Sequence, residues 1–243
     1  MPEDLKKIGD FSTTNWSVVL EAGRTDVERA AVAMERLCGK YWHPIYVFVR
    51  RRGSNHHKAE DLTQSFFAHL LEKETLKEVD RQKGKFRSFL LASLTNFLVN
   101  EWDRRQTLKR GGNRQIISMD EMSAEQLYSG EPVEIFSPEH LFDRRWAITI
   151  IEQVLTRLKN DYAASGKAEM FIKLEAGLTG EVTPGSYANW AAALDMNEGA
   201  VKVALHRLRR RFGELLRSEV AYTVADPAEV AEEIRHLLAA ISM

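Results

Sequence analysis

Apolar residues recur almost throughout this sequence at the spacing of an α-helix, and no segment alternates between apolar and polar residues as a half-buried strand does. The pattern predicts helices over 27–52, 58–71, 85–105, 139–162 and 167–176, and a last helix that begins at Asp226 and Pro227. Pro44 should kink or split the first of these helices, because proline removes a backbone hydrogen bond. The expected fold class is therefore all-α.

A stretch rich in glycine, serine and proline, residues 111–138, divides the predicted helices into two groups. We therefore expect two helical domains joined by a polar linker, with a short extension at each end. The expected segments are an N-terminal extension (1–26), a first domain (27–110), the linker (111–138), a second domain (139–218) and a C-terminal helical extension (219–243).

Charge is nearly balanced over the whole chain, with 34 Lys and Arg and 35 Asp and Glu, but it is segregated along the sequence. Residues 81–114 hold nine basic and two acidic side chains, whereas residues 115–145 hold seven acidic and two basic ones. Since screened charges act only over about 10 Å at moderate salt, such blocks predict separate basic and acidic surfaces. A single cysteine, Cys38, and the absence of a long apolar run are typical of a soluble, cytoplasmic protein.

The segment SYANWAAALDMNEGAVKVALHRLRRRF, residues 186–212, predicts a helix-turn-helix. Asn197 is placed to cap the second helix, which begins near Glu198. Contacts between the two helices are expected from Ala188, Ala191, Ala192, Leu194, Val201, Leu205 and Leu208. The opposite face gathers Lys202, Val203, His206, Arg207 and Arg210. Such a face can reach base edges and phosphates, so the segment predicts DNA binding.

Three motifs together resemble the extracytoplasmic-function family of bacterial RNA polymerase sigma factors. Residues 187–216 resemble that family's promoter-reading C-terminal domain without a gap. AEDLTQSFFAHLL, residues 59–71, resembles its core-binding helix, and FRSFLLASLTNFLVNEWDRR, residues 86–105, resembles its promoter-melting helix. The motifs occur in the family's order with the linker between the two halves, and the whole chain is similar to a longer, planctomycete-type subgroup.

The resemblance implies a region 2-like bundle for the first domain and a region 4-like helix-turn-helix domain for the second. It implies that core polymerase is bound by Glu60, Asp61, Leu62, Gln64 and Phe67. Contacts to the melted minus-ten strand are implied for Lys85, Arg87, Asn96, Asn100, Trp102, Arg104 and Arg105, because phosphates need cations and unstacked bases need amide or aromatic surfaces. The minus-thirty-five element would be read by Asn197, Glu198, Ala200, Lys202, Val203, His206, Arg207 and Arg210. Phe86, Phe89 and Phe97 are instead expected in the core, because they lie on an apolar stripe.

Two features depart from the family's usual pattern. The family often has an acidic residue where this chain has Ser65, which suggests the hypothesis that phosphorylation of Thr63 or Ser65 supplies the missing charge. The alternative is that both are ordinary polar surface residues. The C-terminal helix is expected to pack on the helix-turn-helix domain, and the alternative is that its acids, Glu229, Glu232 and Glu233, cover the basic recognition face.

The implied function is a non-enzymatic sigma factor that binds core RNA polymerase and directs promoter recognition, DNA melting and transcription initiation. Promoter DNA and core polymerase are the expected partners, an anti-sigma factor or a Ser/Thr kinase is a candidate regulator, and the free protein is expected to be a monomer. The alternative is a helix-turn-helix regulator with an N-terminal sensor domain, which predicts dimers on palindromic sites. No cofactor or metal site is predicted, and His56 and His57 are interpreted as loop histidines without a partner.

Overall fold

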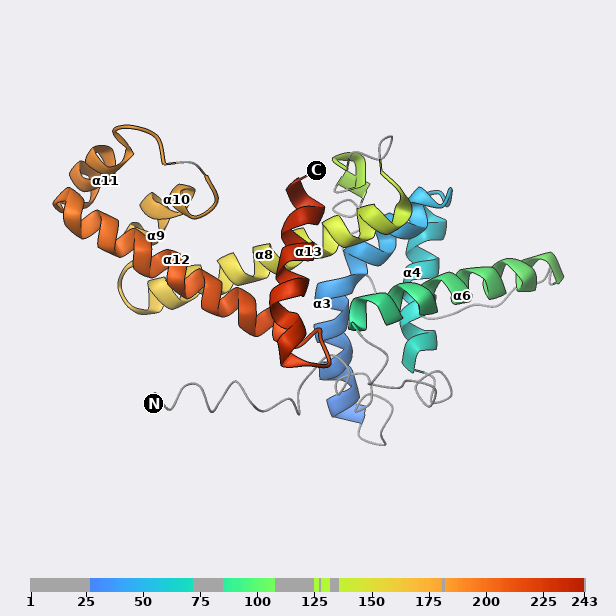
Figure 1. Ribbon diagram of the computed structural model, residues 1–243. Coiled ribbons are helices and arrows are strands. Elements are labelled where there is room, and N and C mark those ends of the chain that lie inside the picture. Colours follow the sequence, from blue (N-terminus) through green and yellow to red (C-terminus); the bar gives the residue numbers. More distant parts are fainter. Residues whose placement is uncertain are drawn as a thin grey trace. The chain divides into compact units, whose positions relative to one another are not determined.

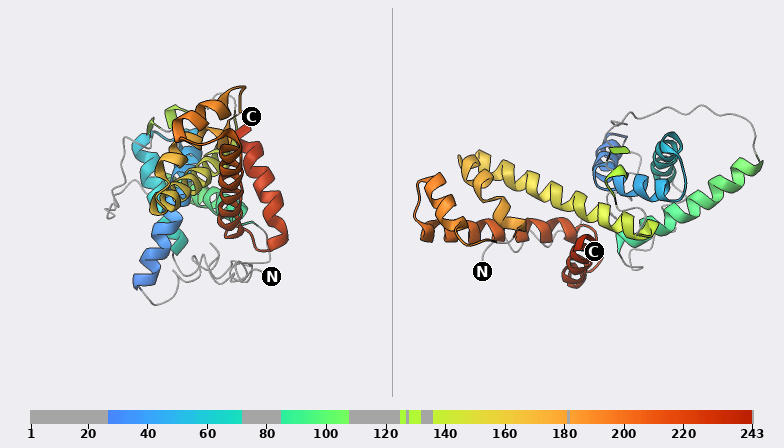
Figure 2. Two further views of the ribbon diagram at one scale, coloured as in Figure 1. Left: turned by 90° about the vertical axis from the view of Figure 1, so that its left-hand side faces the viewer. Right: turned by 90° about the horizontal axis from the view of Figure 1, so that it is seen from above.

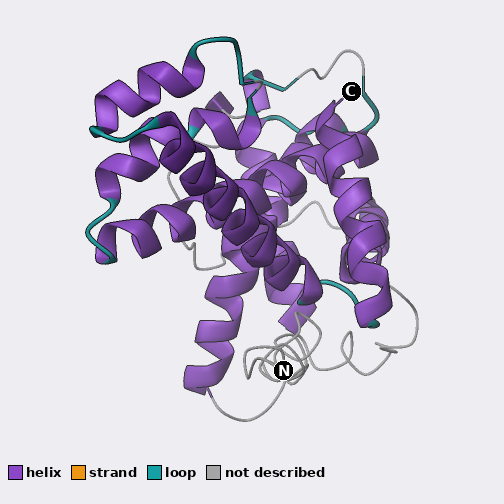
Figure 3. Cartoon of the chain, turned by 60° about the vertical axis from the view of Figure 1, so that its left-hand side comes forward, coloured by secondary structure: helices purple, strands orange, loops and turns teal. Residues whose placement is uncertain are grey.

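The computed structural model describes residues 27–71, 85–107, 125–126, 128–131, 136–180 and 182–242. Every regular element in these ranges is a helix, and none is a strand (Figure 3). The predicted all-α fold class is confirmed for the described part of the chain.

The chain divides into two compact units, which we call unit 1 and unit 2. Unit 1 comprises the residues up to Thr149 together with those from Val220 onward, and unit 2 is Ile150–Glu219. The boundaries expected from the sequence differ from this division, because they assigned 139–149 to the second domain and treated 219–243 as an extension of it. Side-chain burial accounts for the difference, since both segments contribute buried residues to unit 1, among them Phe142 and Leu237.

Unit 1 is built from long helices and a C-terminal helix (Figure 1). They are α3 (Val27–Arg51), α4 (His56–Leu71), α6 (Phe86–Thr107), the first part of α8 (Pro138–Ala164), the 3-10 turn η3 (Pro227–Glu229) and α13 (Val230–Ser242). α3 continues without interruption through Pro44, so the expected split does not occur. Tyr41, Ile45 and Phe48 on either side of the proline are fully buried, and their packing offsets the lost backbone hydrogen bond.

Aromatic side chains from four helices form the core of unit 1. The stripe predicted on α6 supplies Phe86, Leu90, Leu94 and Phe97, which are all buried at helical spacing. The Phe86 ring lies 5.3 Å from that of Tyr41 on α3, and the Phe97 ring lies 5.5 Å from that of Phe66 on α4. The core assignment of Phe86 and Phe97 is therefore confirmed, whereas Phe89 is only half-buried.

The C-terminal helix begins as the sequence predicts but packs elsewhere. The Asp226 carboxylate accepts a hydrogen bond from the Ala228 amide at 2.8 Å, and Pro227 follows the cap. From α13, Glu233 is completely buried and forms an ion pair with Arg87 on α6. The expectation that this helix packs on the helix-turn-helix domain is wrong, because its buried acid requires the cations of unit 1.

Unit 2 contains the end of α8 and four further helices, of which the three short ones lie around the N-terminal half of α12 (Figures 1 and 2). They are α9 (Ala168–Leu174), α10 (Ala176–Thr179), α11 (Ser186–Leu194) and α12 (Glu198–Ala221). The sequence predicted a single helix over 167–176 where the structure has α9 and α10. The buried core includes Val154, Leu158, Phe171, Leu174, Val201, Leu205 and Leu208.

Gly177 on α10 lies close against Leu205 of α12 and Trp190 of α11. A Cβ atom there would lie 2.9 Å from a methyl carbon of Leu205 and 3.0 Å from the Trp190 ring. Both distances are shorter than van der Waals contact, so any larger residue must displace a packed side chain.

Gly177→Ala should lower the free energy of unfolding by about 1–3 kcal/mol, because the added methyl group overpacks this contact. Gly39→Ala is the matched control: it lies inside α3, where no described atom comes within 4 Å of an added Cβ. It should raise the free energy of unfolding by about 0.5–1 kcal/mol through the helix propensity of alanine. Urea denaturation of both variants tests the assignment, and equal behaviour would contradict it.

Candidate nucleic-acid interface

A three-residue turn joins α11 to α12 in unit 2. Asp195 ends α11 in the left-handed conformation, with φ 50° and ψ 48°, and the Met196 amide donates to the Ala191 carbonyl at 3.0 Å. The Asn197 side-chain oxygen accepts a hydrogen bond from the Ala200 amide at 2.8 Å, which caps the start of α12. The predicted start of the second helix near Glu198 and the predicted cap at Asn197 are therefore confirmed.

The two sides of α12 differ as its sequence predicts. Val201, Leu205 and Leu208 are buried, as is Ala191 on α11, whereas Leu194 is half-buried and Ala188 and Ala192 are exposed rather than part of the buried interface. The exposed residues implied for the minus-thirty-five element are Asn197, Glu198, Lys202, Val203, His206, Arg207 and Arg210, and Ala200 is half-buried. Val203 is 50% exposed, so an apolar group lies among the cations.

The cations of α12 fall into two groups according to their contacts. Arg209 donates two hydrogen bonds to the Gly177 carbonyl, at 2.9 and 2.7 Å, and Arg211 forms an ion pair with Asp161 at 3.1 Å. Both arginines therefore make contacts within unit 2, and of these the Arg211 pair is exposed. The Lys202 ammonium lies 5.2 Å from the centre of the Tyr187 ring, and Arg210 pairs only with the exposed Glu214 one turn away. Exposed pairs of this kind are weak, so Arg210 is available to an anionic ligand.

α6 presents a second exposed surface, on unit 1. Asn96 and Asn100 lie one turn apart on its exposed side, and Trp102 and Val99 are 65% and 52% exposed. The structure therefore places the two amides and the indole implied for the minus-ten strand on the surface of one helix. Arg104 and Arg105 also belong to α6, but their side chains lie outside the described residues.

Lys85, which directly precedes α6, and Arg87 near its start are not on that surface. Arg87 is 8% exposed, and its guanidinium pairs with Asp143 at 2.8 Å and with Glu233 at 2.9 Å. Lys85 pairs with Glu232 at 2.8 Å and with Glu233 at 3.1 Å. The implied phosphate contacts of Lys85 and Arg87 do not fit this arrangement, because both cations are already neutralised by acids of α8 and α13.

These pairs shift the protonation equilibria of the residues that form them. Burial by itself would raise the pKa of Glu233, but the hydrogen bond and charge of Arg87, aided by Lys85, outweigh it and hold the pKa below its ordinary value. Burial likewise opposes the charged form of Arg87, and its two acidic partners nevertheless raise the pKa of its guanidinium. Both groups therefore remain charged in the folded protein.

The residues implied for polymerase binding on α4 are mostly internal. Glu60, Leu62 and Phe67 are buried, Gln64 is half-buried, and Asp61 alone of the five is exposed. The three buried residues pack within unit 1, so their side chains do not form an exposed surface on α4. A family motif marks positions on a helix, but neighbouring helices decide which of them are covered.

Phosphorylation of Thr63 does not fit the structure. Thr63 is completely buried, and its hydroxyl donates to the Ala59 carbonyl at 2.7 Å. Ser65 is half-buried and remains the more accessible of the two hydroxyls. The interpretation of Thr63 as a surface residue is also wrong, because its methyl and hydroxyl groups are both within the fold.

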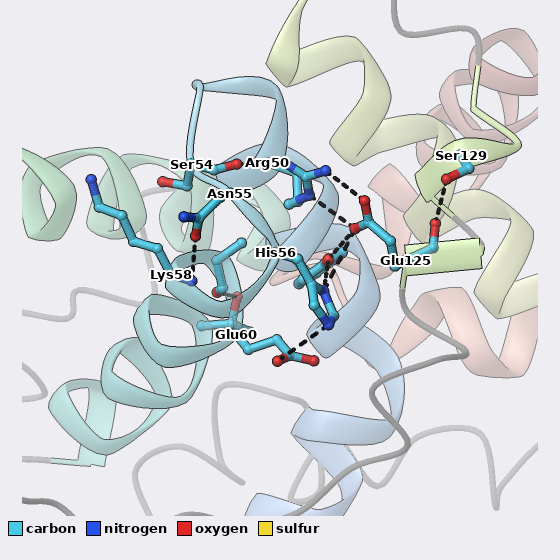
Figure 4. A network of polar contacts seen from close by, with 11 residues as sticks. Arg50, Ser54, Asn55, His56, Lys58, Glu60, Glu125 and Ser129 are labelled. Carbon is cyan, nitrogen blue, oxygen red and sulfur yellow. Dashed lines mark hydrogen bonds and ion pairs between the residues drawn. The ribbon is translucent and has the colours of Figure 1, made fainter.

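Sequence reasoning missed a polar network at the start of α4 (Figure 4). The Tyr46 hydroxyl contacts Nδ1 of His56 at 2.8 Å and donates to Glu125 at 2.5 Å. Arg50 binds Glu125 through two nitrogens, at 3.0 and 2.6 Å, and this pairing holds the pKa of Glu125 below its ordinary value. His56 is therefore not a loop histidine without a partner, and Glu125 is anchored to α3 although it lies in the expected linker.

The network also brings three potential metal ligands together. His56, His57 and Glu60 offer ligand atoms that all lie within 4.8 Å of one another. The sequence spacing of these residues is not one of the usual zinc motifs. His56 and His57 are adjacent, and Glu60 follows His56 by four residues at the start of α4. The adjacent histidines were the only available signal.

No family model, curated protein or solved structure matches this chain. Among the described helices, none combines the length and apolar character needed to cross a lipid bilayer.

Glu233→Gln should lower the free energy of unfolding by about 3 kcal/mol, because it removes a carboxylate that faces a buried guanidinium. Glu232→Gln is the matched control, since Glu232 is largely exposed, and it should change stability much less. Guanidinium denaturation of the two variants provides the comparison. A larger effect at Glu232 would contradict the assignment of Glu233 as the anchor of α13.

The same pair predicts a pH dependence. The folded pKa of Glu233 is lowered from the ordinary value of 4.5, so its contribution to stability is complete above pH 4.5 and is lost as the pH falls through the folded pKa. As the pH is lowered from 5, the free energy of unfolding of the wild-type protein should therefore fall more than that of Glu233→Gln protein, as measured by denaturation at each pH.

Proposed function

We propose that this protein is a sigma factor that binds core RNA polymerase and places α12 on the minus-thirty-five element of a promoter. The observation that carries the proposal is the capped start of α12, whose exposed face combines cations with one apolar side chain. Such a helix, held against a shorter one across a tight turn, is the form in which helix-turn-helix proteins enter the major groove.

The chemistry of the α12 face is suited to both kinds of DNA contact. Lys202, Arg207 and Arg210 carry charges that can neutralise phosphates, while Val203 can contact a thymine methyl group. Gly199 lies on the exposed side at the start of the helix and leaves room for close approach of the backbone. Affinity would therefore come from phosphate neutralisation and sequence preference from the few groups at the N-terminal half of α12.

The exposed face of α6 supports the second part of the proposal. Asn96, Asn100 and Trp102 offer amide and aromatic surfaces of the kind that hold unpaired bases. Because Lys85 and Arg87 are engaged internally, we assign cationic support of the strand to Arg104 and Arg105 rather than to the beginning of the helix. On α4, the polymerase contact is proposed for Asp61 and Gln64, whose side chains are not fully covered.

Binding to core polymerase is the direct test of the proposal. Purified protein should form a stable complex with bacterial core RNA polymerase in gel filtration and should direct run-off transcription from promoters selected out of a random library. Asp61→Arg should weaken the complex, because it reverses an exposed charge without disturbing the core. Dimeric protein that binds palindromic DNA and ignores core polymerase would instead favour a helix-turn-helix regulator with an N-terminal sensor domain.

Arg210→Ala should weaken duplex binding and reduce the slope of log affinity against log salt by about one, because one phosphate contact is lost. Arg157→Ala, on α8, provides the matched control, since it removes an exposed arginine from unit 2 outside the proposed interface. Fluorescence anisotropy at several salt concentrations measures both slopes. Equal slopes for the two variants would contradict the assignment of the α12 face.

A further inference from the structure

The first turns of α4 carry a group of side chains that the DNA and polymerase contacts proposed above do not use. His56 is half-buried, His57 is exposed and Glu60 is nearly buried, and their potential ligand atoms all lie within 4.8 Å of one another. Nε2 of His56 lies 3.7 Å from a carboxylate oxygen of Glu60 (Figure 4). His56 is held in this arrangement by its hydrogen bond to Tyr46, and Glu60 by its burial within unit 1.

The hydrogen bonds behind His56 determine which of its nitrogens is protonated. Glu125 is bound by Arg50 through both oxygens, so it is a carboxylate and can only accept hydrogen bonds. The single Tyr46 proton is therefore donated to Glu125, at 2.5 Å. The Tyr46 oxygen must then accept the 2.8 Å hydrogen bond from Nδ1 of His56. In a neutral imidazole this leaves the proton on Nδ1 and the lone pair on Nε2.

That lone pair lies on the side of the ring that faces Glu60. Nε2 of His56 and a carboxylate oxygen of Glu60 are 3.7 Å apart. Two donor atoms of a tetrahedral zinc ion, each bound at about 2.0–2.1 Å, are about 3.4 Å apart. A small change of side-chain rotamer is therefore enough to bring both atoms to a zinc ion. The Nδ1 hydrogen bond is also the support that metal-binding histidines commonly have on their second nitrogen.

We propose that His56, His57 and Glu60 bind a zinc ion at the start of α4. Two imidazoles favour zinc or a similar transition metal over magnesium or calcium, which prefer oxygen ligands. Three protein ligands leave a fourth coordination position on the zinc ion. Because His57 is exposed, water can reach that position. Bound zinc would fix the position of His56. Through the hydrogen bonds of Tyr46 it would also help to hold Glu125 on α3. The inference is independent of the proposed function.

Isothermal titration of the full chain with zinc chloride tests the site. The protein is prepared without a histidine tag and treated with EDTA, and the titration contains neither DNA nor polymerase. We expect one zinc ion per chain and no heat with magnesium chloride. His57→Ala and Glu60→Gln should each raise the dissociation constant by about tenfold or more. His57 is exposed, so the alanine variant should unfold at the wild-type temperature in EDTA, whereas zinc should raise the unfolding temperature of wild type more than that of the variant.

A variant outside the ligand set distinguishes a supported site from a simple histidine cluster. Tyr46→Phe keeps all three ligands and the shape of the core but removes the acceptor for Nδ1, and it should raise the zinc dissociation constant by about 10–100-fold. His206→Ala, which removes an exposed imidazole of unit 2, should leave zinc binding unchanged. Absence of binding, or unchanged affinity in any of His57→Ala, Glu60→Gln and Tyr46→Phe, would overturn the proposed site and indicate at most adventitious binding.

Discussion

A buried guanidinium governs the construction of unit 1. Arg87 is almost inaccessible to water, and an unpaired charge in that position would cost several kcal/mol. Asp143 from α8 and Glu233 from α13 supply the two carboxylates that compensate it, and they lie 56 and 146 residues away along the chain. Three helices must therefore meet at one point before the charge is satisfied. This requirement explains why the C-terminal helix belongs to unit 1.

Internal pairing also changes the meaning of the charge blocks in the sequence. Part of the acidic stretch after residue 115 neutralises arginines within unit 1, since Glu125 binds Arg50 and Glu131 binds Arg144. On α12, Arg209 and Arg211 are likewise used within unit 2. Fewer cations are therefore available for DNA than the sequence suggests. Those on the exposed face of α12 are the ones on which the proposed promoter contact depends.

The quality of the sequence predictions follows the range of the interactions involved. On α12 the buried and exposed positions were predicted correctly, because a two-sided helix with one covered face follows helical periodicity. On α4 three residues of the implied polymerase contact, Glu60, Leu62 and Phe67, are buried, because packing against α3 and α6 covers more of that helix than a motif can reveal. The His56 environment was missed for the same reason, since Tyr46 and Glu125 lie outside its local sequence.

The sequence by itself determined the all-α class, the course of most helices and the helix starts at Asn197 and Asp226. These features depend on periodicity and on hydrogen bonds that span two or three residues, so local residues are sufficient. Only the tertiary structure decided that α13 joins unit 1, that Arg87 is a structural residue and that Thr63 is sealed from solvent. Each of those outcomes depends on which distant side chains share a buried, low-dielectric environment, and no local pattern encodes that choice.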